Sequence, residues 1–131
     1  MNCDVLRNIL LVGSGSFFGG AARYALSLMM KDLSKGFPWA TLAANLLGCL
    51  LIGCLWGFFS LEANESSNWA LFLTVGFCGG FTTFSTFSKE ALMMIQYGNV
   101  WGFAGYVALS IILGIALVAL GDSLIPGCVM K

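Results

Sequence analysis

Four long apolar runs decide what this chain can fold into. They cover residues 9–30, 39–59, 69–97 and 100–120 of a chain of 131 residues. About 20 helical residues cross the roughly 30 Å hydrocarbon core of a bilayer, and only 9% of the residues are charged, against about a quarter in soluble domains. We therefore predict an all-α, multi-pass protein of a cell membrane, in which residues 1–131 form a single four-helix domain in the lipid bilayer.

Composition argues against several classes of function. The six basic and six acidic residues leave no net charge, which removes the electrostatic basis for binding nucleic acid. Because the chain has no histidine, it lacks the residues of a Ser-His-Asp triad or an HExxH zinc site, and we expect no enzyme. Its five cysteines show no CxxC spacing, so we interpret them as small packing residues rather than as a disulfide framework or metal site.

Small residues on the first two runs predict close helix packing. Gly15 and Gly19 are four apart in the first run, as are Gly53 and Gly57 in the second, a spacing that lets helix backbones approach in a membrane.

Four spans place both termini on one side. The basic residues are spread almost evenly over the two sides, so the positive-inside rule gives little bias and predicts insertion both ways round.

The third run is too irregular for one unbroken helix. Its apolar first part, residues 69–81, spans only roughly 20 Å, and the sequence GGFTT follows at positions 79–83. We predict a break near 79–83, mid-membrane, with a second half-helix beginning near Phe84. A broken helix at that depth exposes carbonyls that can ligate a cation. A kink that only aids packing is the alternative, and the pattern leaves both open.

Polar and aromatic side chains mark a second kind of candidate site. Asn45 lies within an apolar run, where an amide either bridges helices or faces a pore, and we leave both open. Phe84 and Phe87 project on one helix face. Such rings usually face lipid or core, but their electropositive edges can also contact an anion, for which Asn45, Tyr106 and Ser110 would supply donors.

Three segments together closely resemble the signature of the Fluc (CrcB) family of fluoride channels. They are GFCGGFTTFSTFS at 76–88 followed by Glu90, GGAARY at 19–24, and TLAANLLG at 41–48. The similarity runs through all four spans in order. Two positions depart from the pattern: Ala40 stands where many relatives have glycine, and Gly114 where some carry a hydroxyl.

The resemblance implies a dual-topology, antiparallel homodimer with two fluoride pores and a structural Na⁺ at its centre. The Na⁺ would be held by backbone carbonyls of Gly79 and Thr82. The pore residues would be Asn45, Phe84, Phe87, Ser85, Thr86, Tyr106 and Ser110. Arg23 and Glu90 would lie near the pore mouths.

The expected function is passive, fluoride-selective export down the electrochemical gradient, which lowers fluoride toxicity. One alternative is a proton-coupled small multidrug exporter, which requires a membrane-embedded carboxylate; Glu90 is the nearest such group. A second is a non-transporting packing subunit, which leaves the Phe-Ser-Thr-Phe-Ser stretch unexplained.

Overall fold

Long helices account for nearly all of the structure, a computed structural model that describes residues 2–61 and 67–125. Within these residues every regular element is helical, and four helices are long and apolar enough to cross a membrane. They are Cys3–Met29, Trp39–Leu61, Asn68–Gln96 and Val100–Ser123. Cys128, Lys131 and most of the polar connection between the second and third spans lie outside the described residues.

The first helix, α1 (Cys3–Met29), begins several residues before the first apolar run. Asp4 occupies its first turn, where a carboxylate is favoured by the helix dipole, and it forms an ion pair with Arg7 at 3.3 Å. Polar residues thus extend the helix beyond its apolar stretch. A short 3₁₀ helix, η1 (Leu33–Lys35), then leads into α2 (Trp39–Leu61).

The third span consists of several joined pieces. A continuous helical rod is made of α3 (Asn68–Ala70), the π-helix η2 (Leu71–Cys78) and α4 (Gly79–Phe81), and α5 (Phe84–Gln96) follows after an interruption. Gly98, with φ of +77°, and Asn99 form the turn into α6 (Val100–Ser123). Residues with positive φ are usually glycine because a Cβ would be strained there.

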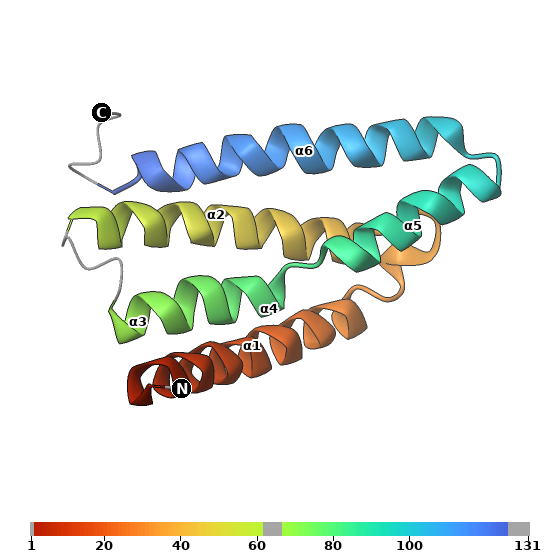
Figure 1. Cartoon of the computed structure of the whole chain (residues 1–131). Helices are drawn as coiled ribbons and strands as arrows, with labels where there is room; N and C mark the ends of the chain where they lie inside the picture. The colour runs from red at the N-terminus through yellow and green to blue at the C-terminus, as the bar shows by residue number, and fades with distance from the viewer. Residues whose placement is uncertain (1, 62–66, 126–131) are drawn as a thin grey trace.

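The helices are arranged as two packed pairs linked by the interrupted span (Figure 1). Helix α1 packs along η2 and α4, α2 packs along α6, and α5 contacts α6 and α2. The chain therefore leaves α1 at the interruption and crosses towards α6. The start of α1 and the end of α6 lie at the same end of the bundle (Figure 1).

The predicted glycine-mediated packing is confirmed on α1. A Cβ on Gly15 would collide with the carbonyl of Phe72, and one on Gly19 with that of Phe77. These contacts bring α1 into backbone contact with the rod that precedes the interruption. Many large apolar side chains elsewhere are exposed, as expected where lipid covers the surface.

Candidate functional site

The third span is interrupted at Thr82 and Thr83. Thr82 has ψ of 159° and Thr83 has φ of −150°, both extended, between the end of α4 and the start of α5. Thr83 caps the second half-helix, since its Oγ1 accepts a hydrogen bond from the N–H of Thr86 at 3.3 Å. The hydroxyl of Thr82 donates to the carbonyl of Cys78 at 2.9 Å. Each threonine hydroxyl thus bonds to the half-helix on its own side.

The interruption changes the partners of the backbone carbonyls around it. In an unbroken helix each carbonyl accepts from the N–H four residues later, but the N–H of Thr83 bonds to a side chain of α2 instead. The carbonyl of Gly80 accepts from Nε of Arg23 at 3.3 Å. Across residues 2–61 and 67–125, no hydrogen bond reaches the carbonyls of Gly79 or Thr82. These two oxygens are free to accept from, or to ligate, something else.

Asn45 of α2 clamps the interruption through two hydrogen bonds. Its Nδ2 donates to the carbonyl of Thr83 at 3.1 Å, and its Oδ1 accepts from the N–H of Thr83 at 2.8 Å. The bridging interpretation of Asn45 is therefore correct. Because Asn45 also lines the cavity described next, a pore role stays a prediction beside it.

A cavity of about 420 Å³ lies beside the interruption. Its lining comes from both half-helices, α2 and α6, and carries no charged side chain; it comprises Asn45, Gly48, Cys49, Ile52, Thr74, Cys78, Gly79, Thr82, Thr83, Phe84, Phe87, Ser110 and Ile111. The hydroxyl oxygen of Ser110 is buried without a hydrogen-bond partner among the described residues. The cavity thus unites both carbonyl-bearing residues of the expected cation site with four residues of the expected anion site.

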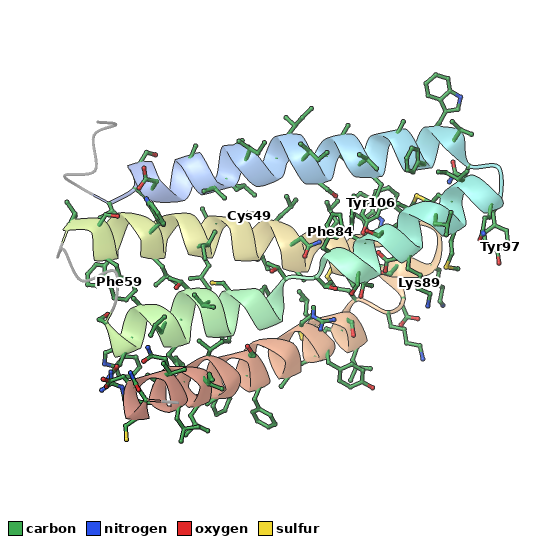
Figure 2. The ribbon with its side chains drawn as sticks, in the orientation of Figure 1. Cys49, Phe59, Phe84, Lys89, Tyr97 and Tyr106 are labelled. Atoms are coloured by element: carbon green, nitrogen blue, oxygen red, sulfur yellow. The ribbon has the colours of Figure 1, made fainter. Side chains whose placement is uncertain are left out.

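The two phenylalanines at the start of α5 lie next to each other. The ring centroids of Phe84 and Phe87 are 5.8 Å apart, with an interplanar angle of 38°. Phe84 is 79% exposed and lies beside the interruption (Figure 2). Phe87 is half-buried, and its ring centroid is 5.0 Å from that of Tyr106 on α6. The pair therefore extends from the outer surface of the single chain to its core.

Glu90 of α5 forms hydrogen bonds to side chains of α2 and α6. Its Oε1 accepts from the hydroxyl of Thr41 at 2.8 Å, and its Oε2 accepts from the hydroxyl of Tyr106 at 2.7 Å. The side chain of Tyr106 is fully buried. Glu90 and Thr41 also line a second cavity of about 370 Å³ near the connection that contains Lys35. Glu90 thus lies between the packed core and this second cavity.

Other residues expected at the site lie outside the first cavity. Ser85 is exposed, with its Oγ 3.5 Å from Oγ1 of Thr83, and Oγ1 of Thr86 accepts from Oγ1 of Thr83 at 3.1 Å. The ring of Tyr106 packs against that of Phe87 in the core, and its hydroxyl donates to Glu90. Arg23, also outside the cavity lining, reaches the carbonyl of Gly80 from α1. Some of the expected site residues therefore line the first cavity, and the others lie outside its lining, on α5 and α6 or on α1.

Two functional roles were missed by reasoning from the sequence. Thr83 accepts one hydrogen bond from Asn45 through its carbonyl, donates another to Asn45 through its N–H, and caps α5 with its hydroxyl. In the sequence, only the hydroxyl drew attention to this residue. Thr41 bonds Glu90 and lies four residues before Asn45, a spacing that places both on one face of α2. The spacing of Thr41 and Asn45 indicates this polar face in the sequence. It does not indicate that Glu90 is the hydrogen-bond partner of Thr41.

Comparison with known proteins gives a consistent match. The family model described as CrcB-like protein, Camphor Resistance (CrcB), matches residues 10–122. A protein of Desulfotalea psychrophila named Fluoride-specific ion channel FluC is 45% identical over 118 residues, covering 90% of this chain and 91% of its own.

Two further relatives carry the same name. The Phocaeicola vulgatus protein is 40% identical over 117 residues, which cover 88% of this chain and 96% of its own. The Clostridium perfringens protein is 49% identical over 92 residues, which cover 70% and 72%. The family match at residues 10–122 contains the second and third candidate spans and most of the first and fourth.

Proposed function

The chain belongs to the CrcB family, and we propose from this membership that it is a fluoride-selective ion channel of the membrane. In the proposed activity, fluoride leaves the cytoplasm passively, down its electrochemical gradient, which lowers fluoride toxicity. Hydrofluoric acid crosses membranes as a neutral molecule and dissociates in a less acidic cytoplasm. An inside-negative potential then favours exit of the trapped anion by about 2.3 kcal/mol per charge and 100 mV.

The cavity beside the interruption is the observation that carries the proposal. It gathers the amide of Asn45, the unpaired hydroxyl of Ser110 and the rings of Phe84 and Phe87 around one space without a charged side chain. An anion there would exchange water for hydroxyl and amide donors and for electropositive ring edges. Binding without a full positive charge is favourable but weak enough for release, which conduction requires.

The proton-coupled multidrug exporter is the weaker proposal. Such a mechanism needs an embedded carboxylate that exchanges protons with a substrate, and Glu90 would have to be that group. Both oxygens of Glu90 accept hydrogen bonds, from Thr41 and Tyr106, so the carboxylate is already engaged. The family and its fluoride-channel relatives support the channel and not the exporter.

Two antiparallel copies are part of the proposal, with the interruption at the middle of the bilayer. Phe84 is 79% exposed, and Ser85 beside it is also exposed. The hydroxyl of Ser85, close to the unpaired carbonyls of the interruption, would be poorly placed against lipid. A second copy would cover Phe84 and Ser85 and complete two pores, with Ser85 and Thr86 contributing hydroxyls to the lining.

A structural Na⁺ fits the backbone around the interruption. The carbonyls of Gly79 and Thr82 have no hydrogen-bond partner among the described residues, and both residues line the cavity. These carbonyls would hold the ion, and one chain supplies too few oxygens to enclose it, whereas a two-fold axis doubles them. The bound charge would offset the negative end of each first half-helix and join the two copies.

The remaining site residues mark the proposed ends of the pore. From the cavity, an anion would pass the rings of Phe84 and Phe87 towards the hydroxyls of Tyr106 and Thr41. The second cavity, lined by Glu90 and Lys35 among others, would form one mouth. Arg23 donates to the carbonyl of Gly80 beside the interruption, and from there its positive charge would favour anions at the other mouth of the pore.

Fluoride efflux from liposomes tests the proposed function. Purified full-length protein is reconstituted into vesicles loaded with potassium fluoride, and a potassium ionophore balances the charge. An electrode should then report rapid fluoride release, while matched vesicles loaded with potassium chloride should release little chloride. Absence of release, or equal release of both anions, would contradict the proposal.

Labelling of Cys3 tests the proposed dual topology. Cys3 is exposed at the start of α1, so a membrane-impermeant thiol reagent can reach it only from one side of a closed vesicle. In cell membrane vesicles of uniform sidedness, with Cys128→Ser as background, about half of the Cys3 thiols should react. Complete labelling or complete protection would show a single orientation and exclude an antiparallel dimer.

A further inference from the structure

The end of the first half-helix has two different faces. Gly79 and Thr82 line the cavity, whereas Gly80 lies against α1 and is absent from that lining. A Cβ on Gly80 would meet the backbone of Ser16, so this residue is held close to α1. The consecutive carbonyls of Gly79 and Gly80 therefore have different surroundings, although both belong to the same helix end.

Arg23 satisfies the carbonyl on the α1 face. Its Nε donates to the carbonyl of Gly80 at 3.3 Å, and a cation at a helix C-terminus is favoured by the helix dipole. Without this contact, the carbonyl of Gly80 would be an orphan acceptor, and the N–H four residues later, that of Phe84, is the donor that would extend the helix across the interruption. Arg23 therefore competes with continuation of the helix.

We infer that Arg23 is a positioning residue that sets the cation selectivity of the Gly79 and Thr82 carbonyls. By holding the carbonyl of Gly80 on the α1 face, it keeps Gly80 out of the ligand set and fixes the helix end that carries the other two oxygens. The inference rests on the proposed function, since it assigns a role towards the proposed Na⁺. The proposed role of Arg23 is to set the positions of these backbone carbonyls, in addition to any effect of its positive charge.

Selectivity separates this positioning role from a plain effect of charge. A positive charge near a cation site disfavours Na⁺ and K⁺ alike, because both carry one charge. A change in the spacing of the carbonyls alters the fit of one ion relative to the other. A loss of fold stability lowers the melting temperature in every salt and leaves the preference between ions unchanged.

The test uses thermal unfolding of the full-length protein in detergent. The protein is titrated with NaCl or KCl against a background of choline chloride at constant ionic strength, and the rise in melting temperature gives the half-saturating concentration of each cation. The variants are Arg23→Gln, which removes the charge, and Arg23→Lys, which keeps the charge but not the planar guanidinium. Ser16→Ala is the matched control, since its hydroxyl donates to the carbonyl of Gly76 at 3.3 Å from the same helix.

The expected result is a loss of preference for Na⁺ over K⁺. The half-saturating K⁺ concentration divided by the half-saturating Na⁺ concentration should fall by about tenfold in Arg23→Gln, the equivalent of about 1.4 kcal/mol. It should fall by a smaller factor in Arg23→Lys and stay unchanged in Ser16→Ala. If Arg23→Gln yields no folded protein, the fall in Arg23→Lys decides the question.

Two results would overturn the inference, and they differ in what else they overturn. If the Arg23 substitutions change the half-saturating concentrations of Na⁺ and K⁺ by the same factor, or leave both unchanged, the ratio stays at its wild-type value. Arg23 then does not position the carbonyls, while the cation site itself would stand. If neither cation stabilises the wild-type protein, the proposed Na⁺ site fails and the inference fails with it. Fluoride efflux, measured separately, would still decide the channel activity.

Discussion

Asn45 and Thr83 pair through their amide groups, one from a side chain and one from the backbone. Nδ2 of Asn45 donates to the carbonyl of Thr83 at 3.1 Å, and the N–H of Thr83 donates back to Oδ1 at 2.8 Å. The pair satisfies the backbone of an extended residue where a membrane offers no water to do so. Asn45 therefore holds the interruption open and faces the cavity at the same time.

Asn45→Asp should abolish fluoride efflux. The carboxylate keeps the bond from the N–H of Thr83 but turns a second oxygen towards the carbonyl of Thr83, and it places an anion on the cavity wall. We expect a loss of about 1–3 kcal/mol of unfolding free energy, measured by thermal unfolding, together with no efflux from liposomes.

Asn68→Asp is the matched control for this charge. Asn68 is the first residue of α3 and is exposed, and a carboxylate is favoured at a helix N-terminus, so efflux should be normal. A conducting Asn45→Asp channel would count against Asn45 as a pore donor and leave it only the clamping role.

Thr82→Ala should retain the Na⁺-dependent rise in melting temperature. The substitution removes the hydroxyl bond to the carbonyl of Cys78, but that carbonyl still accepts from the N–H of residue 82 at 3.0 Å. The proposed ligand is the main-chain oxygen, which alanine also carries. We expect a cost of about 1 kcal/mol in unfolding free energy and an unchanged half-saturating Na⁺ concentration.

Thr83→Ala makes the comparison with Thr82→Ala informative. It removes the cap of α5, at a cost of about 0.5–2 kcal/mol, while its backbone bonds to Asn45 can persist. A complete loss of the Na⁺ effect in Thr82→Ala at normal folding would mean that the hydroxyl, and not the carbonyl, is the ligand.

Local signals in the sequence were enough to locate the interruption, but not to describe it. Residues 79–83 were predicted to break the helix; the extended residues are Thr82 and Thr83, while Gly79 and Gly80 stay helical. The difference has a local reason: Thr83 caps the next helix with its own hydroxyl, and α1 packs against Gly80. Glycine permits an interruption without requiring one.

The hydrogen-bond partners across the helices could not be predicted from the sequence. Asn45 bonds to a residue 38 positions away, and Thr41 bonds to Glu90 49 positions away. Such pairs depend on how three helices pack and rotate, which the apolar pattern of a membrane span constrains weakly, since most faces are apolar. The four spans follow from length and hydropathy alone, whereas the orientation of their few polar groups requires the tertiary structure.

Glu90→Gln should reduce fluoride efflux and lower stability. The carboxylate accepts from the hydroxyls of Thr41 and Tyr106; a glutamine amide presents an N–H₂ to one of them, so one buried hydroxyl loses its acceptor. The expected cost is about 1–3 kcal/mol, measured by thermal unfolding beside efflux. Lys89→Gln, at an exposed neighbour, is the control and should behave as wild type.

The same variant separates a channel from a proton-coupled exporter. For a channel, a pH gradient alone should drive no substrate transport in the wild type or in Glu90→Gln. Uphill transport driven by protons in the wild type and lost in Glu90→Gln would overturn the channel assignment.

Phe84→Ile combined with Phe87→Ile should stop fluoride efflux while the protein still folds. Both changes keep apolar bulk but remove the aromatic edges, which are the proposed contacts for the anion. Because Phe84 is 79% exposed in the single chain, its replacement should hardly change the stability of the fold of one subunit. Phe87 packs on Tyr106 at 5.0 Å, so its replacement should cost about 0.5–1.5 kcal/mol.

Phe17→Ile is the matched control for the exposed ring. Phe17 lies on α1, is 72% exposed and is absent from both cavity linings described above, so the same change there should leave efflux normal. If the double variant at 84 and 87 conducts fluoride as the wild type does, the rings are packing residues. The hydroxyl and amide donors of the cavity would then have to account for anion passage on their own, because the cavity lining holds no charged group to replace the rings.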